Sequence, residues 1–339
     1  MDLVTFWFIV ITFLWTGFFV LEGFDFGVGM LHEFVGRDEP GRRAAINTIG
    51  PLWDANEVWL IVAGAAMFAA FPGWYATMFS GLYLALALLL AAVILRGVSF
   101  EYRAKHPSAR WRRGWDGLLT AASFLAPFLI GVALGDLLYG LPIDAEQEFT
   151  GSFWDLLQPY ALVTGFAVMM MCMLHGATFL ALKTTDDVRA RAGRLARFIG
   201  PVTVVAVIAF VVLTHVGTEK GHALNAIEVL AVVAAVAATV FVYLRRERPA
   251  FAATTVTIAS GIITIFVDLY PNVMVSSTNA MYNLTVHNTA SPPYSLKVLT
   301  VVGVVMLPIV LAYQAWTYYV FRRRVSRNEF LTEAAPENG

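Results

Sequence analysis

The stretch LVTFWFIVITFLWTGFFVLEGFDFGVG, residues 3–29, is an apolar run that carries two carboxyl groups, Glu22 and Asp25, near its end. Residues 3–21 contain no charged side chain. A helix of about 20 residues crosses the hydrocarbon core of a bilayer, so this run is long enough to span a membrane. The stretch therefore predicts a transmembrane helix that ends with two acids one helical turn apart.

The composition extends this reading to the whole chain. Of its 339 residues, 58% are hydrophobic and 14% are charged, whereas a soluble domain has about 25% charged residues. The mean hydropathy is +0.68. These values predict an all-α integral membrane protein. The net charge of −1 gives no basis for a nucleic-acid partner, and the single Cys172 cannot form a disulfide within the chain.

We expect nine transmembrane helices, which form one polytopic membrane domain over residues 1–339. The predicted segments are 3–29, 50–71, 74–95, 115–138, 157–182, 199–216, 226–244, 250–270 and 295–321. Only the short sequence PGW separates the second segment from the third, which predicts an antiparallel hairpin.

The basic residues orient these segments. Of the 23 lysines and arginines, all but Lys220 and Lys297 fall on connections of one parity, and Arg96 is assigned to the connection after the third segment. Cytoplasmic loops collect basic residues, so the N-terminus is expected outside and the C-terminus in the cytoplasm. The opposite face is acidic, with Asp136 assigned to its fourth connection.

Four acids lie in or beside the first two segments, namely Glu22, Asp25, Asp54 and Glu57. Each pair has i,i+3 spacing and so shares a helix face, and the predicted topology places both pairs toward the cytoplasmic side. A carboxylate inside a bilayer costs several kcal/mol and commonly marks a proton or ion path. The alternative is that these acids are hydrated or paired with the arginines that follow the first segment, Arg37, Arg42 and Arg43.

Other candidates have plainer interpretations. Gly23 and Gly27 form a G-x-x-x-G pattern, which predicts close packing of two membrane helices. His175 lies among methionines and is either a haem or copper ligand or, as we expect, a packed polar residue. Asp268 is either an intramembrane or an interfacial acid. His215, His222 and His287 are expected near the outer surface. The chain has no H-x-x-H, H-E-x-x-H or C-x-x-C pattern, so we expect no metal held by this chain alone.

Four stretches together resemble subunit II of the cytochrome bd-type quinol oxidases. They are EGFDFGVGML (22–31), INTIGPLWDANEVWLIVAGAAMFAAFP (46–72), RGVSFEYRAK (96–105) and residues 271–330. The resemblance implies two four-helix bundles plus one peripheral helix. It also implies a heterodimer with subunit I, which carries haems b and d and the main quinol site, in a bacterial cytoplasmic membrane. The complex oxidises quinol and reduces oxygen to water.

The resemblance also implies roles for particular residues. Asp25 and Asp54 are associated with the proton route, and Trp53 and Asn56 complete the W-D-x-N motif. Glu22 stands where an aspartate is common, and Glu57 matches an amide in some members. No catalytic residue is expected in this chain. A bound quinone, for which menaquinone is our choice, small accessory subunits and lipid are further expected partners. The rival hypotheses are a proton-coupled secondary transporter and a membrane cytochrome that binds haem alone.

Overall fold

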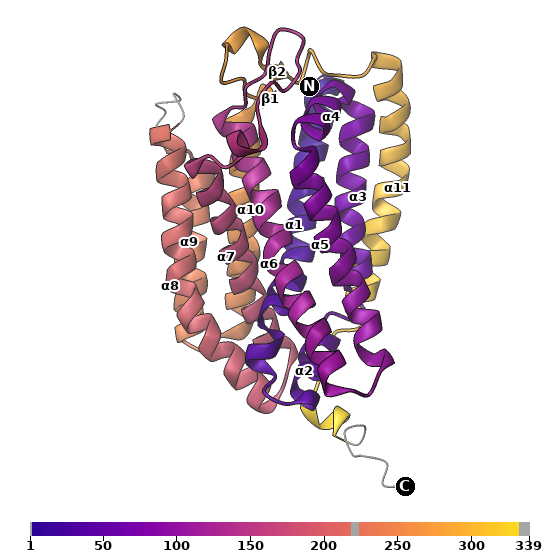
Figure 1. The fold of residues 1–339 in the computed structure, drawn as a ribbon, viewed down its shortest axis with the longest axis vertical. Coiled ribbons are helices and arrows are strands. Elements are labelled where there is room, and N and C mark those ends of the chain that lie inside the picture. The colour runs from indigo at the N-terminus through magenta and orange to yellow at the C-terminus, as the bar shows by residue number, and fades with distance from the viewer. Residues whose placement is uncertain (1, 218–223, 332–339) are drawn as a thin grey trace.

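The structure, a computed structural model, describes residues 2–217 and 224–331, and helices dominate it (Figure 1). The α-helices of this part of the chain are α1 (Leu3–Val35), α2 (Glu39–Asn47), α3 (Trp53–Ala70), α4 (Pro72–Gly81), α5 (Tyr83–Tyr102), α6 (Ala109–Tyr139), α7 (Pro159–Lys183), α8 (Asp186–Gly217), α9 (Ala226–Tyr243), α10 (Glu247–Leu269) and α11 (Pro293–Val320). Short 3-10 helices are η1 (Arg103–Lys105), η2 (Phe153–Leu156), η3 (Ala280–Tyr282) and η4 (Arg327–Phe330). Two strands, β1 (Asn272–Met274) and β2 (Leu284–Thr285), pair antiparallel. Lys220 and His222 lie outside the described residues.

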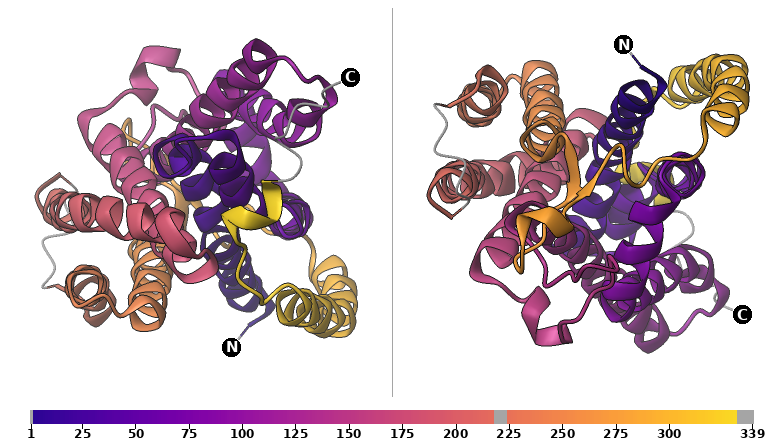
Figure 2. Two further views of the ribbon diagram at one scale, coloured as in Figure 1. Left: turned by 90° about the horizontal axis from the view of Figure 1, so that it is seen from below. Right: turned by 90° about the horizontal axis from the view of Figure 1, so that it is seen from above.

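The long helices stand side by side, with α7 packed against α1, α6, α8 and α10 (Figure 1). On one side α8, α9 and α10 pack together, and on the other α1, α3, α5 and α6 do so. Helix α11 lies at the edge, against α1 and α3, as the end-on views show (Figure 2). The beginning of α1 and the C-terminal η4 lie at opposite ends of the molecule (Figure 1).

Eight helices of the described residues are long and apolar enough to cross a membrane. They are α1, α5 extended by η1, α6, α7, α8, α9, α10 and α11, and they correspond to eight of the nine predicted segments. The segment predicted at 50–71 corresponds to α3, which is not among the eight. Its first two turns contain Asp54, Asn56 and Glu57, and these polar residues lower its mean hydropathy.

The third predicted segment, 74–95, differs most from the structure. It is divided into α4 and α5, which meet at Leu82, and α5 continues to Tyr102. The assignment of Arg96 to a cytoplasmic connection is therefore wrong: Arg96 lies within α5 and is fully buried. It shares a helix face with Leu89, Ala92 and Ser99, and an ion pair compensates the burial of its charge.

Two further boundaries move for a related reason, because helices continue past the end of an apolar run. Asp136, predicted in an outer connection, lies in α6 and is buried, since residues 130–138 of that helix are buried throughout. Helix α8 begins at Asp186, well before the predicted start at residue 199, and its first turns carry four arginines. Such amphipathic ends are invisible to a hydropathy count.

The predicted packing role of the glycines in α1 is confirmed. A Cβ atom on Gly27 would lie 2.2 Å from the carbonyl oxygen of Cys172 and 2.7 Å from the Cα of Gly176. A Cβ on Gly23 would meet the Cys172 sulfur at 3.4 Å. Glycine at position 27 therefore permits α1 and α7 to touch along their backbones, which directs the opposite face of α1 toward α3 and α5.

The C-terminal segment is tied to α2 at the end of the molecule opposite the start of α1 (Figure 1). Arg327 of η4 forms an ion pair with Asp38, which also caps α2 by accepting a hydrogen bond from the backbone N–H of Gly41 at 3.0 Å. Hydrogen bonds from the Arg327 guanidinium hold the pKa of Asp38 below its usual range. The contact connects η4 to α2 rather than to the body of the membrane helices.

Candidate functional site

A buried polar cluster lies between α1, α3, α5 and α11 on the side of the predicted cytoplasmic connections. Its members are Glu22, Asp25, Asn56, Glu57, Arg96, Gln314 and Tyr318. Glu22, Asp25, Asn56 and Arg96 are each 0% exposed. Buried polar groups on this scale require mutual partners, so the contacts within the cluster decide what it can do.

Arg96 is the cation of this cluster. Its guanidinium forms an ion pair with Glu22 and donates a hydrogen bond to Glu57 Oε2 at 3.2 Å. The same group lies over the ring of Phe26, 4.8 Å from its centroid, and 5.4 Å from that of Phe100. Aromatic faces stabilise a desolvated guanidinium, so Arg96 is held between two carboxylates and two rings.

Asn56 connects the second carboxylate to α11. Its side-chain N–H groups donate to Asp25 Oδ2 at 2.7 Å and to the carbonyl of Leu21 at 3.2 Å. Its Oδ1 accepts hydrogen bonds from Gln314 at 2.7 Å and from the Tyr318 hydroxyl at 2.9 Å. All four hydrogen-bonding positions of the amide are thereby used, which fixes the orientation of Asn56 against Asp25.

The W-D-x-N motif sets the start of α3. A turn over residues 49–52 precedes the helix, and Trp53 at its first position packs on Phe100 with ring centroids 5.1 Å apart. A Cβ on Gly97 would lie 3.3 Å from the same indole. Trp53 thus fastens α3 to α5 and thereby sets the separation between Glu57 and Arg96.

The charge balance of the cluster is unequal. Glu22, Asp25 and Glu57 surround one guanidinium, so full ionisation of all three acids would leave two uncompensated negative charges. Uncompensated buried charge is costly, and carboxyl groups that share such a site take up protons instead. Asp25 Oδ1 and Arg96 Nε have no hydrogen-bond partner within residues 2–217 and 224–331. The arrangement is suited to holding and exchanging a proton.

The structure brings three of the four predicted acids together and leaves Asp54 apart. Asp54 is exposed on α3, one turn from Glu57, whose side chain is 17% exposed. Glu22 and Glu57 are paired with Arg96, whereas Arg42 donates hydrogen bonds to the carbonyl of Gly36 and to Asp116. Sequence reasoning missed Arg96, Gln314 and Tyr318. The spacing of Leu89, Ala92, Arg96 and Ser99 on one helix face was the available signal for the arginine.

A second ionic network lies nearer the end of the molecule that carries α2 and η4, around Asp116 of α6. Arg103 donates to Asp116 at 2.5 Å and forms a bidentate pair with Glu39 at 2.8 and 2.9 Å. His32 and Arg42 contact Asp116 at 3.3 and 3.4 Å. His32, Glu33 and Asp116 are close enough to share a metal ion, but two arginines already bind the Asp116 carboxylate. The network therefore joins α1, α2, α5 and α6 as an ionic brace.

His175 has the partners of a packed polar residue. One ring nitrogen lies 2.7 Å from Thr254 Oγ1, the other lies 3.2 Å from the carbonyl of Val20, and the ring stacks on Phe251 at 4.6 Å. Both nitrogens are engaged by the chain itself, which disfavours haem or copper ligation. Near the C-terminal end of α10, Asp268 accepts a hydrogen bond from Asn225 at 3.3 Å.

The remaining predicted outer-surface histidines differ in their surroundings. His215 pairs with Glu228 at 3.0 Å, and its side chain is about one quarter exposed. His287 is exposed and lies just after β2. The residue after β1, Val275, is held by a hydrogen bond in which the N–H of Leu141 donates to its carbonyl at 3.0 Å.

Comparison with known proteins gives a consistent answer. Residues 3–321 match the family model described as cytochrome bd terminal oxidase subunit II. The chain is 43% identical over 330 residues to a cytochrome bd ubiquinol oxidase subunit 2 of Bacillus subtilis, with 96% of this chain and 98% of the relative covered. It is 35% identical over 360 residues to the cytochrome bd-I ubiquinol oxidase subunit 2 of Escherichia coli, with 95% of both covered.

The fold is also found in a solved structure. A chain from the bd oxidase of Geobacillus thermodenitrificans superimposes with a TM-score of 0.78 at 15% identity, covering 95% of this chain and 99% of that one. At this identity the likeness bears on the fold alone. The match along nearly the whole chain, together with two relatives above 30% identity, places this protein in the cytochrome bd terminal oxidase subunit II family.

Proposed function

We propose that this chain is the haem-free subunit of a bd-type quinol oxidase, paired with a subunit I that holds haems b and d and the main quinol site. The single observation that carries a proton-handling role is the buried group of Glu22, Asp25 and Glu57 around Arg96. Oxygen reduction to water consumes protons, and a membrane-embedded site needs ionisable groups that deliver them. The chain lies in a bacterial cytoplasmic membrane in this proposal.

The route begins at Asp54, which faces outward from the first turn of α3. Glu57 is the next carboxyl group, one turn along the same helix and at the rim of the cluster. Arg96 contacts Glu57 and Glu22 together, and Asp25 follows Glu22 one turn later on α1. Tyr318 and Gln314 reach the cluster from α11 through Asn56, so motion of α11 alters the environment of Asp25.

The membrane topology follows from the same proposal. Helix α3 is the ninth span, because subunit I covers the face that carries Asp54 and thereby removes its polar first turn from lipid. Only 6% of the most apolar stretch of α11 is buried against the rest of the described chain. Helix α11 is therefore the peripheral helix beside two four-helix groups. The N-terminus lies outside and the C-terminal η4 lies in the cytoplasm. Any quinone, accessory subunit or lipid bound to this chain is a further part of the proposal.

Purification of the chain from its native membrane in mild detergent tests the assignment. We expect it to co-purify with a haem-bearing partner and to consume oxygen when given a quinol. Assays with menaquinol and ubiquinol analogues identify the donor. A lone chain without haem that moves a solute across vesicles would contradict the proposal and favour a secondary transporter.

The replacement Asp54→Asn tests the proton route within the assembled complex. We expect oxygen reduction at saturating quinol to slow at least tenfold with haem content unchanged, because the amide cannot carry a proton. Glu146→Gln, an exposed acid on the opposite side of the membrane, is the matched control and leaves turnover unaltered. Full turnover in Asp54→Asn would remove Asp54 from the route, and loss of haem would show that Asp54 serves assembly instead.

A further inference from the structure

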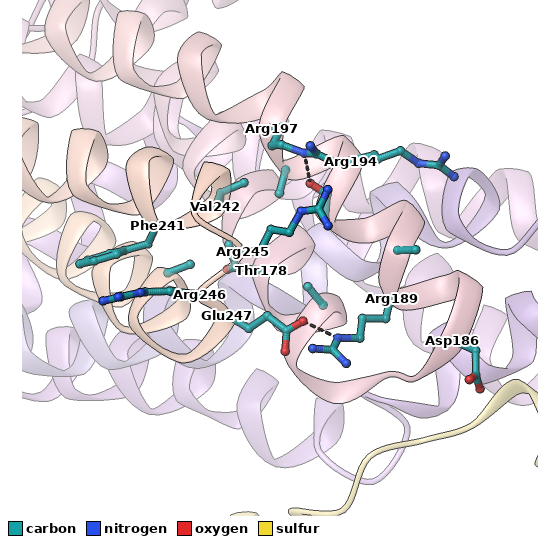
Figure 3. Close-up of a pocket in the computed structure, with 15 residues that line it drawn as sticks. Thr178, Asp186, Arg189, Arg194, Arg197, Phe241, Val242, Arg245, Arg246 and Glu247 are labelled. Atoms are coloured by element: carbon teal, nitrogen blue, oxygen red, sulfur yellow. Dashed lines mark hydrogen bonds and ion pairs between the residues drawn. The ribbon is translucent and has the colours of Figure 1, made fainter.

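A basic pocket lies at the cytoplasmic ends of α7, α8, α9 and α10, away from the polar cluster. Its volume is about 620 Å³, within the range of ligand-binding pockets. Five arginines line it, namely Arg189, Arg194, Arg197, Arg245 and Arg246, together with the acids Asp186 and Glu247 (Figure 3). The proton route uses none of these residues, and their charges give the pocket a net charge of +3.

The charges within the pocket are unevenly satisfied. Glu247 is shared by two arginines, Arg189 of the pocket and Arg324 at 2.9 Å, so its negative charge is fully engaged. Asp186 lies at the far side of the pocket (Figure 3). Arg197 and Arg245 make no ion pair with any carboxylate in the part of the chain that the structure describes. The guanidinium groups of Arg197 and Arg245 are therefore available to an anionic ligand.

Two of these arginines, Arg197 of α8 and Arg245 of the α9–α10 turn, lie on facing elements of the pocket (Figure 3). Arg245 extends from the α9–α10 turn toward the turn of α8 that carries Arg194 and Arg197 (Figure 3). The backbone of Arg245 has φ +57°, and that of Asp186 has φ +52°, conformations in which non-glycine residues are uncommon. The turn thus presents an arginine into the pocket from a position where a glycine would relieve strain.

An exposed apolar surface adjoins the basic pocket. Phe198, next to Arg197 on α8, is 76% exposed, and Leu244, which follows the end of α9 and precedes Arg245, is 59% exposed. Val205 continues the α8 surface toward the membrane interior with 66% exposure. A ligand that contacts both surfaces has an anionic head and an apolar tail, and the pocket lies at the end of the molecule where basic residues mark the cytoplasmic leaflet.

We propose that this pocket binds the phosphate headgroup of an anionic phospholipid of the cytoplasmic leaflet, with Arg197 and Arg245 as its principal contacts and the acyl chains along α8 and α9. Guanidinium groups bind phosphate oxygens with charge-assisted, often bidentate hydrogen bonds. A lipid with two phosphates, such as cardiolipin, gains more from the net charge than one with a single phosphate. The bound lipid would connect Arg197 of α8 to Arg245 of the α9–α10 turn. No ion pair within the described residues connects these two arginines to other parts of the chain.

Native mass spectrometry of the delipidated complex, titrated with cardiolipin, phosphatidylglycerol or phosphatidylcholine, tests this proposal. We expect Arg197→Gln/Arg245→Gln to bind cardiolipin about 30-fold more weakly at one site, equivalent to about 2 kcal/mol. The control Arg113→Gln/Arg323→Gln removes two exposed arginines from the same side of the membrane and keeps wild-type binding. Equal affinity of wild type and the pocket variant, or equal binding of neutral phosphatidylcholine, would overturn the proposal.

Arg245→Gly separates binding from folding. Because glycine adopts a positive φ without steric cost, we expect the thermal midpoint of this variant to stay the same or rise while cardiolipin binding weakens severalfold. Inorganic phosphate is the second probe. Displacement of cardiolipin by submillimolar phosphate would assign the pocket to a soluble phosphate ligand, whereas displacement only at high salt supports a lipid headgroup. The readout is lipid binding, so the outcome is independent of oxidase activity.

Discussion

Replacement of Arg96 by methionine is the most direct test of the buried cluster. Methionine approximates the length of the arginine stem and removes the guanidinium that contacts Glu22 and Glu57. Glu22 is 0% exposed, so it has no access to solvent as an alternative partner. To remain buried, the Glu22 side chain must then carry its own proton.

The free energy needed to protonate Glu22 sets the loss of stability expected in Arg96→Met. An ordinary glutamic acid is half protonated near pH 4.3, and each pH unit above that value is worth about 1.36 kcal/mol, so neutralising it at pH 7 costs about 3.7 kcal/mol. At pH 5 the same step costs about 1 kcal/mol. Loss of one partner from a buried ion pair costs about 3–5 kcal/mol in soluble proteins, which agrees with the value at pH 7. The loss of unfolding free energy in Arg96→Met, relative to wild type, therefore becomes smaller as the pH falls.

Thermal denaturation of the purified complex, followed by tryptophan fluorescence at pH 7.5, 6 and 5, measures this deficit. We expect the difference in midpoint between wild type and Arg96→Met to be largest at pH 7.5 and to narrow at each step downward. The double variant Glu22→Gln/Arg96→Met recovers part of the lost stability, since it removes the fully buried carboxylate that pairs with Arg96. A deficit independent of pH, or a double variant no better than the single one, would refute the electrostatic account.

Three other outcomes follow from particular contacts. Gly27→Ala should lower the thermal midpoint by several degrees, because its Cβ would meet the backbone of α7, whereas Gly64→Ala, with nothing within 4 Å of the added Cβ, should leave it unchanged. Asn56→Leu should slow oxygen reduction and destabilise the complex by about 1–3 kcal/mol for each buried partner left unbonded, as read by turnover and denaturation. The lowered pKa of Asp38 predicts that the η4–α2 contact is intact at neutral pH, where Asp38 is ionised in both folded and unfolded chains. This stabilisation is lost as the pH falls below the ordinary aspartate range through the lower folded value, so protease cleavage near η4 should increase only below about pH 4.

Much of the fold was predictable because the bilayer imposes simple rules on sequence. Apolar length located the eight long apolar helices of the described residues, and the parity of the basic residues supplies a prediction of their orientation. The same rules fail where a helix leaves the hydrocarbon region. Arg96 and the arginines that open α8 are charged yet helical, and a hydropathy count treats them as loop residues. Helical phase, not hydropathy, was the informative property there: Arg96 continues the face of Leu89 and Ala92.

The cluster itself was predictable only in part. Glu22 and Asp25 can be identified from the sequence as acids in an apolar run, but their partners come from distant parts of the chain. Gln314 lies 258 residues from Asn56, and nothing in a single sequence pairs α3 with α11. Long-range contacts of this kind depend on how the helices pack against one another.

Helical geometry explains why Asp54 and Asn56 have different surroundings. Two positions apart on a helix, their side chains point about 160° away from each other, so only one of them can face α1. Asn56 takes that place and bonds Asp25, which turns Asp54 to the outer face of α3. A proton that enters at Asp54 therefore cannot reach Asp25 across the helix. In the proposed route the proton instead passes around α3 by way of Glu57, which lies one turn from Asp54 and forms an ion pair with Arg96, so the continuity of that route would depend on Glu57.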